Sequence, residues 1–323
     1  MEPGAAGFPE RSVRLVPERS ARLSGLDGIR GLAALFVVLH HCRLLSFPGF
    51  PADTGPAWAS WLLYGHFAVV VFIALSGFSL AVKPARSGWR LGGLRRFARR
   101  RAWRILPPYW AALVFSLAVA WALVPQPGQG PPTAKSVVFH GLLVQDLFGS
   151  PTPNGAFWSI AVEAQLYFVL PLLLLVVRRL GAVVMVAAVT VVVLAVGVLA
   201  GGLPVVALLM RLTPQFAVLF AVGVLAAGVL RAPVRAPLHW LALAAFLPVV
   251  VLIAVLGPVR TVANFFWVDL ALAPAAGLFL AAVATGRPRP LVRVLDSRPL
   301  RSLGSFSYSL YLVHAPIVVA LHH

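Results

Sequence analysis

Long apolar segments alternate along the chain with short connections that contain proline, glycine and arginine. An apolar stretch of about 20 residues is long enough to cross the hydrocarbon core of a bilayer as a helix. This rule predicts nine membrane spans, over residues 27–47, 58–82, 105–124, 157–177, 182–200, 212–230, 237–256, 265–284 and 305–322. The expected fold is an all-α, polytopic transmembrane bundle of about nine to ten spans.

Two stretches between these spans do not fit a simple helix. Residues 200–212 contain Gly201, Gly202 and Pro204, which interrupt the apolar pattern. Residues 136–148 are a weak candidate for a further span, and we expect an interfacial or re-entrant helix there.

Composition and charge support a membrane protein and give it an orientation. The chain has 323 residues, of which 60% are hydrophobic and only 11% charged, and its net charge is +18. With the N-terminus in the cytoplasm, 22 of the 27 basic residues fall on the cytoplasmic side, as the positive-inside rule requires. Topology therefore explains the basic charge, and we expect no nucleic-acid partner.

The ends of the predicted bundle and the single cysteine add further expectations. Residues 1–24 are polar and arginine-rich, without the apolar segment of a secretory signal peptide. We expect them to form a disordered cytoplasmic tail before a transmembrane domain over residues 25–323. Because Cys42 is the only cysteine, the chain has no disulfide framework or cysteine metal cluster, and no metal or tightly bound cofactor is expected.

Charged residues inside the first span are the first candidates for function, because burying ionisable groups in hydrocarbon costs several kcal/mol unless they pair or line a cavity. Arg30 and His41 are 11 residues apart, which places them within about 20° of one helix face and about 16 Å apart along the axis. His40 is rotated about 80° from this stripe and is expected to face a neighbouring helix.

Glu163 is the candidate acidic group. It shares a helix face with Ser159 and Tyr167 at a spacing of four residues. Counted from the outer ends of their spans, His41 and Glu163 each lie about 8 to 10 Å deep. We therefore expect them to meet in a water-accessible pocket, together with His66 and Asp269. A structural role for Glu163, as the partner of an arginine or a histidine across a helix interface, is the alternative.

The third span opens with a strongly basic turn. Arg101 and Arg104 are three residues apart and precede two prolines and Tyr109, which is a further candidate for binding the same ligand. Their guanidinium groups can point at one anion from the cytoplasmic side, and such groups suit phosphate oxygens. The sequence therefore predicts a phosphate-bearing ligand. The alternative is that this loop is basic only because it lies on the cytoplasmic side of the membrane.

Taken together, five segments resemble acyltransferase family 3, the integral membrane acyltransferases that modify sugars, peptidoglycan, exported glycans and some antibiotics. The resemblance covers about residues 26–320 and is carried by "LDGIRGLAALFVVLHH", "VFIALSGFSL", "RRRAWRILPPYW", "FWSIAVEAQLYFVLPLL" and "FSYSLYLVHAPIV". It implies that Arg30 and His41 form the family's Arg-x10-His pair and that Arg101 and Arg104 form its Arg-x-x-Arg pair. It also implies an acyl-CoA donor that is met from the cytoplasm.

The resemblance leads to a mechanistic hypothesis. An acyl thioester is already activated, so the enzyme must deprotonate an acceptor hydroxyl and stabilise an oxyanion. We expect His41 to act as the general base, with Glu163 orienting it or binding the acceptor. Direct transfer and an acyl-histidine intermediate both stay open. Arg30 would draw the donor inward, while Ser76 and Gly77 would allow close packing along the pantetheine or acyl path.

The sequence leaves the acceptor open and allows two other functions. The expected activity is transfer of an acyl group, acetyl first among the candidates, to a hydroxyl of a carbohydrate, a cell-envelope glycan or a secondary metabolite. The 25 arginines against two lysines are typical of a GC-rich bacterial genome, so the bacterial plasma membrane is the expected location, with membrane lipid around the bundle. A transporter with a polar midplane site and a non-catalytic scaffold are the alternatives.

Overall fold

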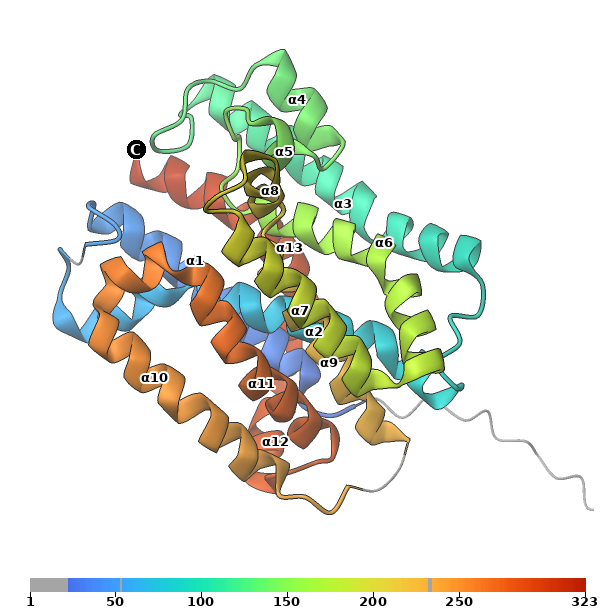
Figure 1. The fold of residues 1–323 in the computed structure, drawn as a ribbon. Coiled ribbons are helices and arrows are strands. Elements are labelled where there is room, and N and C mark those ends of the chain that lie inside the picture. Colours follow the sequence, from blue (N-terminus) through green and yellow to red (C-terminus); the bar gives the residue numbers. More distant parts are fainter. Residues whose placement is uncertain (1–22, 53, 232–233) are drawn as a thin grey trace, which may run out of the picture.

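Helices make up most of this computed structural model, which describes residues 23–52, 54–231 and 234–323 (Figure 1). The long helices are α1 (Leu26–Ser46), α2 (His66–Arg86), α3 (Leu94–Ala122), α6 (Phe157–Leu180), α7 (Ala182–Leu199), α10 (Leu238–Ala263), α11 (Phe265–Ala284) and α13 (Arg298–His322). The short ones are η1 (Ala57–Tyr64), α4 (Ala134–Gly141), α5 (Gln145–Phe148), α8 (Pro204–Leu209), η2 (Met210–Leu212), α9 (Gln215–Ala226), η3 (Ala227–Leu230) and α12 (Arg289–Leu295). No strand occurs among the described residues. Nearly all of the tail expected over residues 1–24 lies outside them.

The predicted all-α, multi-span bundle is confirmed. Within the described ranges, eight helices are long and apolar enough to cross a membrane. A ninth span is reached if the helices over Pro204–Leu212 and Gln215–Leu230, which meet at an angle of 49°, are counted as one. The break follows from the local sequence, because Thr213 has a left-handed backbone with φ of 46° and Pro214 follows it. The interruption expected over residues 200–212 is thus a short helix and a kink.

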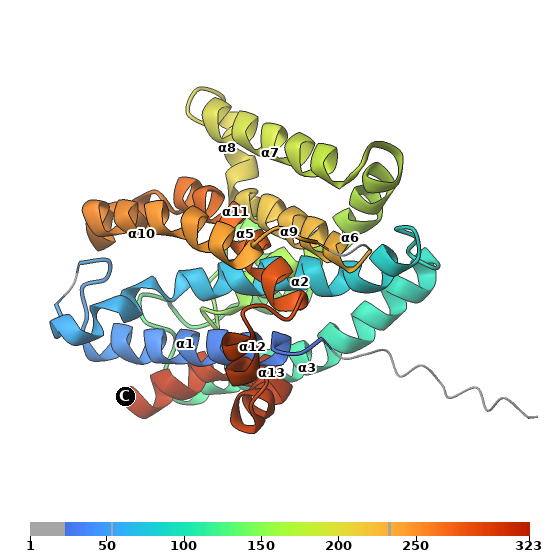
Figure 2. The same cartoon turned by 90° about the horizontal axis from the view of Figure 1, so that it is seen from below.

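The order of the helices places α2 at the centre. It packs between α9 and α11 on one side and α1 on the other, while α3 and α13 lie beyond α1 (Figure 2). The helices α7 and α10 bury few of their residues, and their apolar side chains are expected to face lipid. The polar residues inside the bundle therefore come from the inner helices.

The crossing of α2 and α9 is unusually close because two glycines meet backbone there. A Cβ atom on Gly77 of α2 would overlap the carbonyl of Phe220 on α9, and one on Gly223 would overlap the carbonyl of Ala74. Small residues allow such close approach between helices in a membrane. Gly77, expected to allow close packing along the pantetheine or acyl path, instead packs against the backbone of α9.

The chain between α3 and α6 folds back against α3 instead of crossing the bundle. The Tyr109 hydroxyl donates to the carbonyl of His140 at 2.8 Å, and the Trp110 indole donates to that of Gly141 at 3.0 Å. Asn154 holds the end of this segment through its side-chain amide, which donates to the carbonyl of Leu312 on α13 at 2.8 Å. The segment expected to be interfacial or re-entrant thus forms the two short helices α4 and α5.

This folded-back segment carries a partly buried carboxyl group at Asp146, whose Oδ2 has no hydrogen-bond partner. Burial raises the pKa of Asp146 to about 6 from a model-peptide value of 3.8, so the folded protein holds this proton more tightly than the unfolded chain. The contribution of Asp146 to stability is therefore full below pH about 4 and lost as the pH rises through about 6.

Replacing Asp146 by asparagine is expected to remove this pH dependence. In thermal unfolding between pH 4 and 8, the variant should match the wild type at the acid end. It should become progressively more stable than the wild type toward pH 7. Asp296→Asn, in a partly exposed position 3.8 Å from Arg301, is the matched control. A constant difference between Asp146→Asn and the wild type across the whole range would contradict the assignment.

Candidate active site

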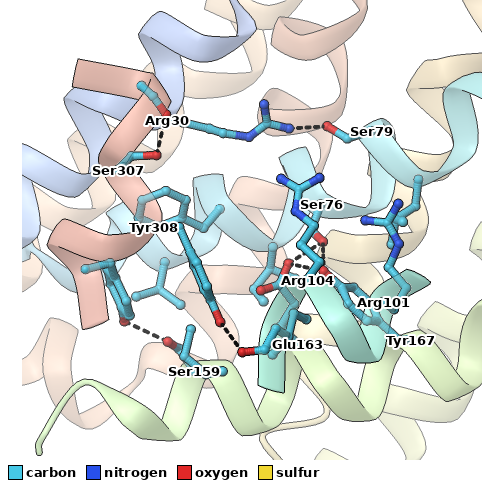
Figure 3. A pocket seen from close by; sticks show the side chains of 18 of the residues that line it. Arg30, Ser76, Ser79, Arg101, Arg104, Ser159, Glu163, Tyr167, Ser307 and Tyr308 are labelled. Carbon is cyan, nitrogen blue, oxygen red and sulfur yellow. Dashed lines mark hydrogen bonds between the residues drawn. The ribbon is translucent and has the colours of Figure 1, made fainter. Parts of the chain in front are cut away.

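A polar pocket of about 270 Å³ lies inside the bundle between α1, α2, α3, α6 and α13 (Figure 3). Its lining includes five charged side chains, Asp27, Arg30, Arg101, Arg104 and Glu163. Charges among membrane-spanning helices mark functional sites by default, because they are expensive to bury and must pair or face water. This pocket is therefore the candidate active site.

Arginines form one part of the pocket wall (Figure 3). Arg30 donates from Nη1 to Asp27 at 3.0 Å and from Nη2 to the hydroxyl of Ser79 on α2 at 2.7 Å, which fixes its guanidinium group across the pocket. Arg101 and Arg104 project from α3 one turn apart, and the buried Nε of Arg101 has no hydrogen-bond partner. The structure thus gathers the three arginines that the sequence singled out.

Glu163 forms the opposite part of the wall with two hydroxyl groups. Its Oε1 accepts a hydrogen bond from Ser76 on α2 at 2.6 Å and another from Tyr167, one turn along α6, at 2.7 Å. Arg30 and Arg101 both interact electrostatically with this carboxylate. The pocket is therefore a charged environment with a net excess of positive charge, which suits an anionic ligand.

Two side chains close one end of the pocket. The hydroxyl groups of Ser159 and Tyr311 lie 2.6 Å apart and share a hydrogen bond. The Tyr311 ring also packs edge-on against Phe72, with 5.5 Å between ring centroids. Behind Tyr311, on the same helix, lies His314, at 5.6 Å between rings. The closed end thus separates the pocket from a pair of histidines.

His41 and His314 form that pair, and their contacts define their tautomers. His41 Nδ1 lies 2.9 Å from the carbonyl of Val37, and His314 Nδ1 lies 2.8 Å from that of Tyr311. Because a carbonyl can only accept, both Nδ1 atoms carry protons. His314 Nε2, 3.2 Å from His41 Nδ1, is therefore an acceptor. This assignment leaves Nε2 of the half-buried His41 unprotonated, as a general base must be.

The expected meeting of four polar residues in one pocket is wrong. His41 contacts His314 instead of Glu163, because depth along a helix axis does not determine which neighbour a side chain faces. His66 lies 2.9 Å from a carboxylate oxygen of the fully buried Asp269 and stacks on Phe265. The His66–Asp269 pair is therefore separate from both the pocket and the His41–His314 pair.

The prediction that Tyr109 binds the ligand is also wrong. Tyr109 is fully buried, does not line the pocket, and binds the carbonyl of His140. It lies five residues after Arg104, which turns it about 140° away around the helix. His40, as expected, turns to a neighbouring helix, where it lies 2.7 Å from the carbonyl of Leu62 on η1.

Sequence reasoning missed Tyr311 and His314 as parts of this region. A signal was present, since Ser307, Tyr311 and His314 recur at intervals of three and four residues along α13. Such a spacing places polar groups on one side of a helix, toward its neighbours.

Comparisons with known proteins show which family the chain belongs to. An acyltransferase domain family, acyltransferase 3, matches residues 23–323. The chain is 28% identical to acyltransferase MdmB of Streptomyces mycarofaciens over 94% of its own length and 81% of that protein. It is also 28% identical to the peptidoglycan O-acetyltransferase OatA of Listeria monocytogenes, over 47% of its own length and 24% of that protein. No solved structure matches the chain. The chain therefore belongs to the acyltransferase 3 family.

Proposed function

We propose that this multi-pass membrane acyltransferase moves an acyl group, acetyl in the simplest case, from acyl-CoA to a hydroxyl group. The acceptor is a carbohydrate, a cell-envelope glycan or a secondary metabolite, and the location is the bacterial plasma membrane. Family membership and the name of the relative OatA support O-acyl transfer. The observation that carries the proposal is the three-arginine pocket, whose lining residue Tyr311 packs against His314 of the His41–His314 pair.

The arginine wall supports binding of the CoA phosphates. Guanidinium groups match phosphate oxygens in geometry and charge, and Arg101 has a buried Nε without a partner. In this proposal Arg101 and Arg104 hold the phosphates near the basic end of α3, and Arg30 draws the thioester end inward. Ser76 and Tyr167 keep Glu163 in place, and that carboxylate binds the acceptor away from the hydroxyl that reacts.

Catalysis then follows from the histidine pair. The acceptor oxygen attacks the thioester carbonyl while His41 Nε2 takes the hydroxyl proton. The tetrahedral intermediate collapses, the carbon–sulfur bond breaks, and the same proton passes from His41 to the leaving thiolate. His314 acts as a positioning residue, because its Nε2 accepts from His41 Nδ1 and fixes the ring orientation. The contact between Ser159 and Tyr311 must open for the thioester to reach His41.

The donor site can be tested with purified protein and two donors. Arg104→Ala is expected to raise the KM for acetyl-CoA by about 10-fold or more, since hydrogen bonds to charged groups contribute about 1.5–3 kcal/mol. The KM for acetyl-pantetheine, which lacks the nucleotide and its phosphates, should change little. Arg178→Ala, at the exposed end of α6, is the matched control. Equal effects of Arg104→Ala on both donors would argue against phosphate binding. If the wild type transferred no acetyl group from either donor, the proposed function would be overturned.

A further inference from the structure

A second cavity, an apolar groove of about 710 Å³, lies between α3, α6 and the turn that follows α4. Figure 1 shows these two helices on the same side of the bundle. The groove is lined almost entirely by apolar side chains, among them Phe97, Leu106, Phe168 and Leu172. Phe168 and Leu172 are 85% and 60% exposed, so the groove opens sideways, toward the surrounding hydrocarbon.

The groove and the polar pocket share a wall. Arg101, Ile105 and Tyr167 line both cavities. On α3 the groove-lining positions begin with Leu94, Phe97, Ala98 and Arg101, which form one stripe at the helical repeat. Whatever fills the groove therefore packs against two side chains of the candidate active site, Arg101 and Tyr167.

Four exposed arginines flank this stripe at the basic end of α3 and take no part in the polar pocket: Arg95, Arg96, Arg99 and Arg100. Trp103 lies about one turn further along α3 and is 74% exposed. Tryptophan is enriched at the boundary between hydrocarbon and headgroups. The arginines are therefore placed at headgroup depth, beside the end of the apolar groove.

We propose that this groove is a binding site for an anionic phospholipid of the surrounding bilayer. One hydrocarbon chain fills the space between α3 and α6, and the headgroup phosphate binds the flanking arginines. Charge complementarity selects this occupant, because clustered basic residues at a membrane boundary attract anionic lipids at about 1 kcal/mol for each residue. A neutral lipid leaves the arginines unmatched, and a soluble anion leaves the groove unfilled. The bound chain braces Arg101 and Tyr167 from the lipid side.

Lipid binding is tested first, by native mass spectrometry of the full chain from nanodiscs with equal amounts of phosphatidylglycerol and phosphatidylcholine. The wild type is expected to retain one phosphatidylglycerol preferentially. Arg95→Gln with Arg99→Gln should lower this preference by about 30-fold, the effect of two arginines at the surface. Arg178→Gln with Arg179→Gln, also basic and exposed, should leave it unchanged. Equal retention of both lipids by the wild type would overturn the proposal.

The groove itself is tested by filling it. Ala164→Trp places an indole in the groove and should abolish retention of the lipid. Leu172→Trp, at the exposed rim, repeats the test in a position where folding is not at risk. Retention of the lipid by the folded Leu172→Trp variant would overturn the proposal, as would stoichiometric displacement of the lipid by a long-chain acyl-CoA, which would assign the groove to the donor.

The brace on Arg101 and Tyr167 is tested by kinetics, and this part rests on the proposed function. The KM for acetyl-CoA should rise when phosphatidylglycerol is replaced by phosphatidylcholine, and Leu172→Trp should show a high KM in both lipids. An unchanged KM with confirmed lipid loss would remove the brace but keep the site. An absence of transfer in every lipid would count against the proposed function, and the binding result would stand by itself.

Discussion

Replacing His41 by alanine is expected to abolish acyl transfer, with kcat lower by about 10²–10⁴-fold, the usual contribution of a general base. The imidazole Nε2 is free because Nδ1 is committed to Val37 and His314. His314, the other histidine behind the closed end of the pocket, has its Nε2 occupied by His41 Nδ1. The measurement is transfer of a labelled acetyl group from acetyl-CoA by purified protein.

The control for this experiment is the neighbouring imidazole. His40 binds the Leu62 carbonyl, and His40→Gln keeps a donor group in place, so its kcat should stay within a few fold of the wild type. His314→Ala should lower kcat with little change in the KM for acetyl-CoA, because it frees the His41 ring without touching the arginine wall. Near-full activity of a folded His41→Ala variant would take His41 out of the mechanism.

Replacing Gly223 by valine is expected to prevent formation of the folded bundle. At this position on α9 even a methyl group would overlap the backbone of Ala74 on α2, and backbone cannot move aside as a flexible side chain can. The helices would have to separate along the most buried span of the described structure. We expect a loss of more than about 3 kcal/mol, which exceeds typical overpacking costs.

The yield of monodisperse protein by size-exclusion chromatography, together with thermal unfolding, checks this expectation. Gly141→Val is the matched control, because a Cβ atom on Gly141 meets nothing within 4 Å. Normal yield and stability of Gly223→Val would show that α2 and α9 do not approach as closely as described.

The spans were predictable because lipid imposes a simple rule on length and polarity. The same rule exposed Arg30 and Glu163, and the basic turn before the third span exposed Arg101 and Arg104; all four line one pocket. A charge inside a membrane helix is energetically costly, so a single sequence is enough to identify it as a functional candidate. The kink at Thr213 was signalled only by the small residues and proline around it.

Which side chains meet was not predictable, because this depends on how each helix is rotated against its neighbours. His41 and Glu163 have similar depth but different partners, His314 and Ser76. Tyr109 follows the arginine pair closely along the chain yet faces another way. Helix rotation is fixed by contacts such as that of Gly77 with the Phe220 backbone, and hydropathy contains no information about them.

The hydrogen bond between Ser159 and Tyr311 has a consequence for the cell as well as for the reaction. A continuous aqueous path through a bilayer protein would let protons run down the membrane potential, which stores about 2.3 kcal/mol per charge at 100 mV. The closed contact interrupts such a path at one end of a charged chamber. A chamber closed in this way can hold charged groups inside the bilayer without discharging the membrane potential.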